Sequence, residues 1–419
     1  MATPSDMLFA GRAPSMDGEG SVNPLTMASA LDVLPDPGAP RRLKNRPYIK
    51  GTVVLPRDHT WTPQDGRLLD VRDLEVEFRM REGVAHAING VSFHLDERET
   101  LAILGESGSG KSVTAQAIMG IIDTPPGYVT GGQVFYCGTD LLTLAEKSRR
   151  TVRGPQIAMI FQDALSALNP VFTVGWQIAE MFRVHRGMNS SDAQRQAIRL
   201  MERVHIPGAK QRVNAYPHQF SGGMRQRIMI AMAISLDPAV LIADEPTTAL
   251  DVTVQAQIMD LLKELQDERG MGLILITHDL GVVANQADRC AVMYAGRLME
   301  TAPSVPLYAE PRHPYTQGLL ESLPRLDTKL GETLPAIGGL PPNLLAMPAG
   351  CPFNPRCKFR VDKCRIGTPP PLEPAGTDRF AACWRKDDPE VLAAASRAAG
   401  AKPSTTEDGL GWDLGGDAA

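Results

Sequence analysis

A glycine-rich segment ending in lysine and serine carries the clearest chemistry in this sequence. Residues 105–112 read GESGSGKS and fit the pattern G-x-x-x-x-G-K-[ST], between an apolar run at 101–104 and a helix-forming run at 113–119. Glycines let main-chain N–H groups close around phosphate oxygens, the lysine reaches the outer phosphates, and the hydroxyl ligates Mg²⁺. The segment therefore predicts a nucleotide-phosphate site formed by Gly105, Glu106, Ser107, Gly108, Ser109, Gly110, Lys111 and Ser112.

Two adjacent carboxylates end a short apolar strand further along the chain. Asp244 and Glu245 directly follow the run Val240–Ala243. Neighbouring residues of a strand point to opposite faces, so the two carboxylates can take different roles. We expect Asp244 to hold Mg²⁺ through water and Glu245 to act as the general base on an attacking water.

Four of the six cysteines fall within a proline-rich segment in the C-terminal part of the chain. Structural zinc sites usually have a tighter cysteine pair, whereas iron–sulfur clusters take four thiolates at more varied spacings. The spacing favours a metal or cluster, with free thiols and disulfides as the alternatives that remain. The cysteines, spaced C-x5-C-x6-C-x18-C, are Cys351, Cys357, Cys364 and Cys383.

Apolar strands that alternate with helices must position these residues. Fully apolar strands between helical segments predict an α/β domain with a largely parallel core sheet. Helical patterns cover 174–235 and 254–269. Strand patterns cover 69–72, 74–78, 87–93, 100–104, 156–161, 240–243, 272–277 and 291–299.

Composition excludes several classes of protein. The chain of 419 residues is 43% hydrophobic and has a net charge of −5, which is ordinary for a globular protein and unlike a general nucleic-acid binder. It contains no apolar run near the ~18–20 residues of a membrane helix and no signal-peptide pattern. We therefore expect a cytosolic chain that binds no nucleic acid.

Shifts in composition divide the chain into four predicted parts. Residues 1–66 are rich in Pro, Gly and Ser and predict a flexible N-terminal extension, and 391–419 predict a flexible tail. Between them we expect a nucleotide-binding domain at 67–305, whose helical subdomain spans about 163–235, and a Pro-rich, cysteine-containing extension at 306–390.

The motifs together resemble the ABC (ATP-binding cassette) ATPases. Phe220–Arg227 reads FSGGMRQR and resembles the family signature, and further motifs stand in the family order. They are Gln162 of the Q-loop, Asp251 of the D-loop, His278 as the switch histidine, and Phe78 where the family stacks an aromatic ring on adenine. The resemblance implies a P-loop NTPase with a RecA-like core sheet, an antiparallel β subdomain and a helical subdomain.

The resemblance also implies how the motif residues act. Glu245, His278 and Gln162 would be the catalytic residues, and Ser112, Gln162 and Asp244 would hold Mg²⁺. In the family, Ser221, Gly222 and Gly223 close over ATP bound to a second ATPase, so each ATP lies between two chains. The family usually has Gln where this chain has Met224, a change that would affect the partner's ATP site.

Longer motifs resemble one branch of the family, the ATPase subunits of bacterial dipeptide and oligopeptide importers. The runs 161–170, 216–227 and 243–257 resemble this branch, and 311–324 resembles its C-terminal extension. The resemblance implies two membrane permeases and a second ATPase subunit as partners, and an extracytoplasmic substrate-binding protein as an indirect one. It places the chain peripherally on the cytoplasmic face of the inner membrane.

The expected function is therefore ATP hydrolysis that powers uptake of dipeptides, oligopeptides or similar small solutes. Met224 itself is frequent in this branch. The branch also carries a similar four-cysteine run associated with a [4Fe-4S] cluster, which favours a cluster over zinc here, although Trp384 stands where the branch usually has His. The alternatives are a soluble ABC ATPase acting on nucleic acid or ribosomes, and a regulatory subunit that binds ATP without hydrolysing it.

Overall fold

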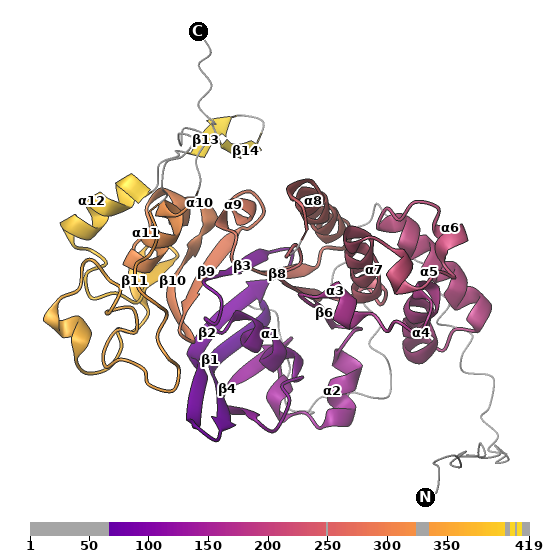
Figure 1. Ribbon diagram of the computed structural model, residues 1–419, viewed down its shortest axis with the longest axis horizontal. Helices are drawn as coiled ribbons and strands as arrows, with labels where there is room; N and C mark the ends of the chain where they lie inside the picture. Colours follow the sequence, from indigo (N-terminus) through magenta and orange to yellow (C-terminus); the bar gives the residue numbers. More distant parts are fainter. Residues whose placement is uncertain (1–66, 249, 324–334, 399–402, 407–408, 413–419) are drawn as a thin grey trace, which may run out of the picture. The chain divides into compact units, whose positions relative to one another are not determined.

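The computed structural model describes residues 67–248, 250–323, 335–398, 403–406 and 409–412. The extension predicted at 1–66 lies outside these residues. Within them, two main sheets and the helices that pack on them form the body of the chain (Figure 1). None of the helices in the described part of the chain is long and apolar enough to cross a membrane.

The first sheet is antiparallel, with strand order β2-β1-β4-β5. The segments predicted at 69–72 and 74–78 form one strand, whose register shifts near Asp73, a residue with φ of 45°. Alternate residues of this strand are buried, as expected for a sheet with one solvated face. The strands are β1 Arg67–Met80, β2 Gly83–Asp96, β4 Gly127–Tyr136 and β5 Thr139–Asp140.

The second sheet has strand order β11-β12-β10-β9-β3-β8-β7-β6. Its strands run parallel from β6 through β7, β8 and β3 to β9, and antiparallel from β9 to β11. The α/β architecture with a largely parallel core is thus confirmed. The strands are β3 Thr100–Leu104, β6 Ile157–Ile160, β7 Val240–Asp244, β8 Gly272–Thr277, β9 Arg289–Tyr294, β10 Arg297–Pro303, β11 Glu373–Gly376 and β12 Arg379–Ala381.

The central strands are buried on both faces, which explains their uninterrupted apolar sequences. Ala102 and Leu104 of β3 belong to a core cluster shared with α4, α5, α7 and α8. Leu101 and Ile103 of the same strand belong to a second cluster, shared with the antiparallel sheet and α1. Alternating side chains therefore attach different layers to the two faces of one sheet.

The β segment predicted at 291–299 consists of two strands. Between β9 and β10, Ala295 and Gly296 have φ of 49° and 75° and reverse the chain. Two consecutive residues with positive φ form the tight turn that suits an antiparallel hairpin. The apolar pattern continues through this turn because both strands are buried, so periodicity alone misses it.

The predicted helical pattern at 174–235 is confirmed as a set of separate, capped helices. The side chain of Thr173 accepts a hydrogen bond from Trp176 N at the start of α4, and Asn189 accepts one from Asp192 N at the start of α5. The helices are α1 Lys111–Met119, α2 Glu146–Val152, α3 Ala164–Ala167, α4 Val174–Arg186, α5 Ser190–Arg203, α6 Ala209–Arg212, α7 Gly222–Ile234, α8 Val252–Arg269 and α9 Leu280–Val283. Short 3₁₀ turns are η3 Leu141–Thr143 and η4 Pro217–Gln219.

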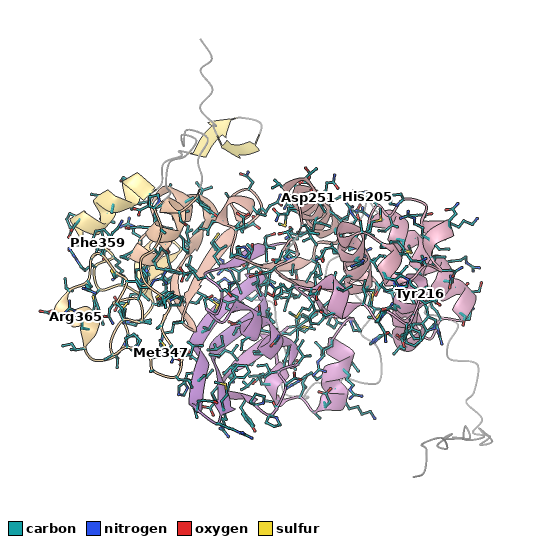
Figure 2. The ribbon with its side chains drawn as sticks, viewed as in Figure 1. His205, Tyr216, Asp251, Met347, Phe359 and Arg365 are labelled. Carbon is teal, nitrogen blue, oxygen red and sulfur yellow. The ribbon has the colours of Figure 1, made fainter. Side chains whose placement is uncertain are left out.

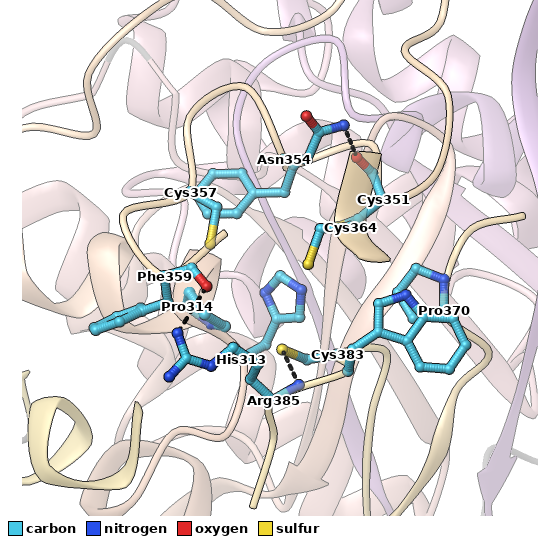
Figure 3. A pocket seen from close by; sticks show the side chains of 12 residues that line it. His313, Pro314, Cys351, Asn354, Cys357, Phe359, Cys364, Pro370, Cys383 and Arg385 are labelled. Atoms are coloured by element: carbon cyan, nitrogen blue, oxygen red, sulfur yellow. Dashed lines mark hydrogen bonds between the residues drawn. The ribbon is translucent and has the colours of Figure 1, made fainter. Parts of the chain in front are cut away.

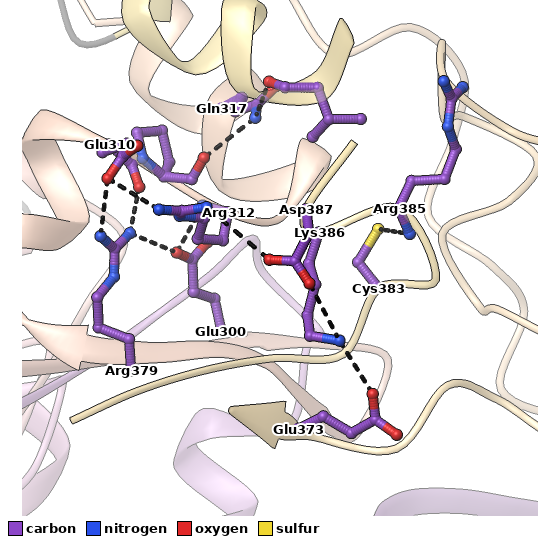
Figure 4. A network of polar contacts seen from close by, with 12 residues as sticks. Glu300, Glu310, Arg312, Gln317, Glu373, Arg379, Cys383, Arg385, Lys386 and Asp387 are labelled. Carbon is purple, nitrogen blue, oxygen red and sulfur yellow. Dashed lines mark hydrogen bonds and ion pairs between the residues drawn. The ribbon is translucent and has the colours of Figure 1, made fainter. Parts of the chain in front are cut away.

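The C-terminal extension continues the core sheet through β12, which pairs with β10. A polar network fixes it further: buried Glu300 of β10 accepts hydrogen bonds from Arg312 N (2.7 Å) and His313 N (2.9 Å), and Arg379 of β12 lies 3.8 Å from the same carboxylate (Figure 4). Its remaining elements are α10 Ser304–Ala309, α11 Pro314–Glu321, η5 Asp362–Arg365, α12 Pro389–Ala398, β13 Pro403–Thr406 and β14 Gly409–Trp412.

Helix α12 crosses the boundary predicted at residue 391. Val391, Ala394 and Ala395 are buried on it. Gln317 of α11 donates a hydrogen bond to Val391 O at 3.0 Å. An Ala-rich sequence that reads as a frayed tail therefore forms a docked helix here, because tertiary packing stabilises it.

Candidate functional site

The strand order of the core sheet brings the predicted motifs to one edge. The phosphate loop follows β3, His278 follows β8, Asp244 ends β7, and Gln162 follows β6. Since β3, β8, β7 and β6 are neighbouring parallel strands, their carboxyl ends lie side by side. This edge is where ligands bind in open α/β sheets.

The phosphate loop is held closed by its own lysine. Lys111 Nζ donates to Gly105 O at 2.8 Å and to Glu106 O at 3.0 Å. Gly296 N also donates to Ser109 O at 2.9 Å, which fixes the loop to the β9–β10 turn. Lys111 is buried, and desolvation lowers its pKa, while the nearby carboxylates of Glu245 and Asp244 oppose that shift. An anion placed in the loop would offset this desolvation.

Asp244 and Ser112 meet directly. Ser112 Oγ donates to Asp244 Oδ1 at 2.9 Å. Asp244 is 4% exposed, and burial raises the pKa of its carboxyl, opposed by the Ser112 hydrogen bond and by Lys111. A carboxylate, a hydroxyl and the nearby amide of Gln162 are oxygen ligands of the kind Mg²⁺ prefers. These residues therefore fit the predicted cation in chemistry.

Glu245 is the residue on which the other motifs converge. Its Oε2 accepts hydrogen bonds from Gln162 Nε2 (3.0 Å) and Thr248 Oγ1 (2.9 Å). Its Oε1 lies 3.4 Å from His278 Nδ1. The residue has φ of 45°, an uncommon value for a side chain of this size, and it directly follows β7. Three neighbours thus orient one carboxylate, as a general base requires.

The predicted residues at this edge differ in exposure. The side chain of Glu245 is 13% exposed and that of His278 is 60% exposed. The predicted catalytic pair therefore combines an oriented carboxylate with a ring that solvent or a ligand can reach. Phe78 lies on β1, half-buried against the core of the antiparallel sheet, and its contact with adenine stays a prediction.

The signature residues Ser221, Gly222 and Gly223 lie at the start of α7 and not directly after a strand of the core sheet. Ser221 is the N-cap of α7, where its Oγ accepts a hydrogen bond from Met224 N at 3.4 Å. Ser221 and Gly222 are exposed. Met224 lies half-buried, and Arg212 Nη1 donates to its sulfur at 3.3 Å. The start of this helix presents free N–H groups, which attract an anion.

Asp251 has a local structural role at the start of α8. Its side chain accepts a hydrogen bond from Val254 N at 3.0 Å, and the residue is exposed (Figure 2). Capping explains why Asp stands here even without a ligand. Its predicted role at the nucleotide interface stays a prediction.

The sequence reasoning missed residues that hold the site from outside the motifs. Thr248 donates a hydrogen bond to Glu245 and orients it. In the sequence, Thr248 is marked only by lying within 243–257, a run that resembles the importer branch. Tyr315 and Arg356 of the extension contact Glu106 of the phosphate loop. No pattern links them to the loop, because 209 and 250 residues separate each from Glu106 along the chain.

The four predicted cysteines line one small cavity in the extension, together with His313, Phe353 and Trp384. The sulfur atoms of Cys357, Cys364 and Cys383 point into the same space (Figure 3). None of the four cysteines forms a disulfide, so the disulfide alternative is wrong. His313 is already satisfied, since its Nδ1 accepts a hydrogen bond from Tyr315 N at 3.0 Å. Burial lowers the pKa of His313 to about 3, so the ring is neutral.

Main-chain N–H groups surround the thiols. Arg385 N donates to Cys383 Sγ at 3.3 Å. Burial raises the pKa of Cys351 to about 11 and that of Cys383 to about 12, and in both cases a main-chain hydrogen bond opposes the rise. Within the described residues, however, no three or more His, Cys, Asp or Glu side chains are placed to hold one metal ion. The described residues therefore give no support to a metal at the four cysteines, neither to the predicted [4Fe-4S] cluster nor to the zinc alternative.

Two family descriptions match this chain. Residues 88–248 match "ABC transporter", and residues 299–364 match "Oligopeptide/dipeptide transporter, C-terminal region". The first match covers the phosphate loop and both carboxylates, and the second covers three of the four cysteines, Cys351, Cys357 and Cys364. Fold and sequence thus agree on a cassette followed by an extension.

Curated relatives span nearly the same length. The chain is 50% identical over 327 residues to the oligopeptide transport ATP-binding protein OppD of Bacillus subtilis, which covers 78% of this chain and 91% of that protein. It is 49% identical over 327 residues to OppD of Salmonella typhimurium, which covers 78% of this chain and 96% of that protein. Putative peptide import ATP-binding proteins of Brucella are similar at 47–52% identity.

Solved structures of cassettes match the fold. The dimeric ATP-binding cassette MJ0796 bound to ADP and Pi matches with a TM-score of 0.51 and 26% identity over 56% of this chain and 98% of that one. A cassette from Clostridium perfringens, cbiO1, matches with a TM-score of 0.51 and 27% identity over 59% of this chain and 92% of that one. The predicted fold class is confirmed by these matches.

Proposed function

The chain belongs to the ATP-binding proteins of oligopeptide ABC transporters, and from this premise we propose that it hydrolyses ATP to drive import of oligopeptides or dipeptides through partner permeases. The observation that carries the proposal is the convergence of Gln162, Thr248 and His278 on Glu245 at the edge that also holds the phosphate loop. The alternative of an ABC ATPase acting on nucleic acid or ribosomes is not favoured by these relatives.

Each residue of the site has a separate role in the proposed hydrolysis of ATP. Lys111 and the main-chain N–H groups of its loop bind the outer phosphates. Ser112, Asp244 and Gln162 would hold Mg²⁺, which would neutralise charge on the transferred phosphoryl group. Glu245 accepts the proton of the attacking water, and Gln162 and Thr248 keep its carboxylate oriented. His278 contacts Glu245 and is exposed enough to reach a phosphate.

We propose that the signature acts on ATP bound to a second ATPase subunit. The support is that Ser221 and Gly222 are exposed at a helix start, where the Ser221 side chain caps α7. A two-chain arrangement also occurs in the dimeric cassette MJ0796. Each ATP would then be enclosed by a phosphate loop from one chain and a signature from the other.

Ser221→Ala tests this arrangement. The ATPase rate of the assembled transporter should fall on the order of tenfold, while the isolated chain binds ATP as the wild type does. Thr173→Ala is the matched control, because Thr173 caps α4 in the same manner and lies outside the ATP motifs. Weaker ATP binding by the isolated Ser221→Ala chain would contradict a role in the partner's site.

An exposed apolar surface supports the proposed permease contact. Phe161, Leu165, Val171 and Phe172 follow the Q-loop region and are 41%, 59%, 68% and 39% exposed. Apolar side chains gathered on a surface are typical of protein interfaces. Binding there would place the chain on the cytoplasmic face of the inner membrane, with an extracytoplasmic substrate-binding protein as an indirect partner.

Reconstitution tests the transport function as a whole. The tagged chain is purified from its native membranes with its partners and placed in lipid vesicles with ATP on the accessible side. We expect peptide-stimulated ATP hydrolysis and uptake of a labelled peptide. Purification of the chain with ribosomal or DNA-repair proteins and without permeases would contradict the proposal.

We also propose that Cys351, Cys357, Cys364 and Cys383 bind a [4Fe-4S] cluster with a structural role. The support is that four thiols from separate segments line one cavity, without disulfides, and that Arg385 N donates a hydrogen bond to Cys383 Sγ. Such hydrogen bonds are typical of cluster sites. The cavity walls would keep solvent from the cluster, and the thiols would tie the proline-rich segment together.

Iron and sulfide analysis of anaerobically purified protein tests the cluster. The wild type should contain about four irons per chain, the number in such a cluster. Cys364→Ala should lose them, whereas the matched variant Cys290→Ala should keep them, because the Cys290 thiol contacts Ser304 Oγ at 3.2 Å outside the cavity. Protein with zinc and no iron would contradict this proposal.

A further inference from the structure

The extension reaches back to the phosphate loop through one buried arginine. Arg356 Nη1 donates to Glu106 Oε2 at 2.6 Å, and Nη2 donates to Glu106 Oε1 at 2.9 Å. The side chain of Arg356 is 5% exposed and that of Glu106 is 26% exposed. A two-pronged guanidinium–carboxylate contact fixes direction as well as distance.

Arg356 is itself held in place. It donates to the main-chain oxygens of Ile337 at 3.2 Å and Gly338 at 3.0 Å, and to the hydroxyl of Tyr294 at 3.3 Å. The Glu106 hydrogen bonds, together with that of Tyr294, raise the pKa of the guanidinium. A charged group with this many partners presents Glu106 with a rigid contact.

A second residue of the extension holds the main chain of Glu106. Glu106 N donates to the hydroxyl of Tyr315 at 2.9 Å, while Glu106 O accepts from Lys111 Nζ at 3.0 Å. The amide, the carbonyl and the carboxylate of this one residue are therefore all engaged. Because Glu106 O is a partner of Lys111, a shift of Glu106 also moves the lysine that binds phosphate.

We propose that Arg356 is a positioning residue for ATP binding, which sets the conformation of the phosphate loop through Glu106, with Tyr315 as its main-chain counterpart. The inference rests on the proposed ATPase function and adds a residue from outside the cassette motifs to it. Its consequence is that the extension takes part in ATP binding at this chain's own loop.

The same contacts connect the loop to the four-cysteine cavity. Phe353 lines that cavity, and its ring lies 5.3 Å from the ring of Tyr315 and 5.4 Å from that of Tyr294. Arg356 directly precedes Cys357. Order in the cysteine segment is thus a condition for the placement of both residues that hold Glu106.

The test compares Arg356→Ala with Lys358→Ala in the assembled transporter. Lys358 is two residues away and pairs with Glu321 at 3.0 Å, so its loss removes an ion pair of the same segment without touching the loop. For Arg356→Ala we expect the KM for ATP to rise on the order of tenfold with a smaller change in kcat. Arg356→Lys should recover part of the loss, because it restores the charge and not the paired geometry.

Glu106→Gln provides a second variant that leaves the contacts of Arg356 within the extension intact. If the two residues act through each other, the double variant Glu106→Gln/Arg356→Ala should bind ATP no more weakly than the worse single variant. Additive losses, or an Arg356→Ala chain that folds and keeps the wild-type KM, would overturn the inference. A wild-type complex without ATPase activity would instead overturn the proposed function, and ATP affinity measured directly would still decide the role of Arg356.

Discussion

Two regions of the molecule are built in different ways. One is the edge of the core sheet that carries the phosphate loop, Asp244 and Glu245, called the ATP edge below, and the other is the four-cysteine cavity of the extension. At the ATP edge, the reactive side chains already contact one another, as in the bonds from Gln162 and Thr248 to Glu245 and from Ser112 to Asp244. In the cavity, four thiols line a common space, and the main-chain N–H of Arg385 donates a hydrogen bond to Cys383 Sγ.

The two regions therefore differ in how far their side chains are ordered before a ligand binds. Side chains that orient each other are preorganised before the substrate arrives, which is the condition for electrostatic catalysis. Buried thiols that do not pair with each other are neutral and gain charge only with a bound metal. The ATP edge is therefore ordered without its ligand, whereas the cysteines would gain charge only if the proposed cluster binds.

Glu245→Gln gives the largest expected effect and tests preorganisation at the ATP edge. The amide keeps the size of the side chain and cannot accept a proton, so the ATPase rate of the assembled complex should fall on the order of 100-fold or more, with ATP still bound. Single-turnover hydrolysis and nucleotide binding measure the two parts. Ordinary turnover would show that Glu245 is not the base.

Gly105→Ala should distort the phosphate loop through steric overlap alone. A Cβ at Gly105 would lie 2.2 Å from Met293 O, and its φ of 149° is strained for alanine. We expect a loss of about 2–4 kcal/mol in the free energy of unfolding, together with weaker ATP binding. Gly108→Ala, where no atom lies within 4 Å of the added carbon, is the control and should cost about 1 kcal/mol. Equal effects would contradict the close approach at Gly105.

Thiol reactivity tests whether the cysteines of the cavity are buried and protonated. In protein freed of metal, Cys351 and Cys383 should react with iodoacetamide at pH 8 on the order of 100-fold more slowly than in the urea-unfolded chain, because burial keeps them protonated. The rate should rise about tenfold per pH unit up to their pKa values of about 11 and about 12. Fast alkylation at neutral pH would mean that the thiols are exposed or ionised.

His313 should make the stability of the folded chain depend on pH. Its pKa is about 3 in the folded chain against 6.5 when unperturbed. Below pH 6.5 the unfolded chain binds a proton that the folded chain does not, so stability should fall by about 1.4 kcal/mol per pH unit toward pH 3. Urea unfolding of wild type and His313→Gln measures the slope, with His86→Gln as an exposed control. An unchanged slope in His313→Gln would contradict this assignment.

Much of the ATP edge follows from the sequence, since each motif combines residue types with a local strand or helix. The run GESGSGKS and the pair Asp244 and Glu245 predict their chemistry and their place after apolar strands. The two-strand turn at Ala295 and the docked helix α12 were not predictable in this way. They depend on packing between segments that are distant along the chain.

The strand–loop–helix units, the order of the motifs and the family resemblance can be recognised in the sequence, because local hydrogen bonding and apolar periodicity are encoded by neighbouring residues. Tertiary packing is what brings Gln162, Thr248 and His278 to Glu245, and what pairs Arg356 with Glu106 across 250 residues. The order of the strands in the sheet brings these residues into contact. That order results from the burial of whole layers rather than from any single segment.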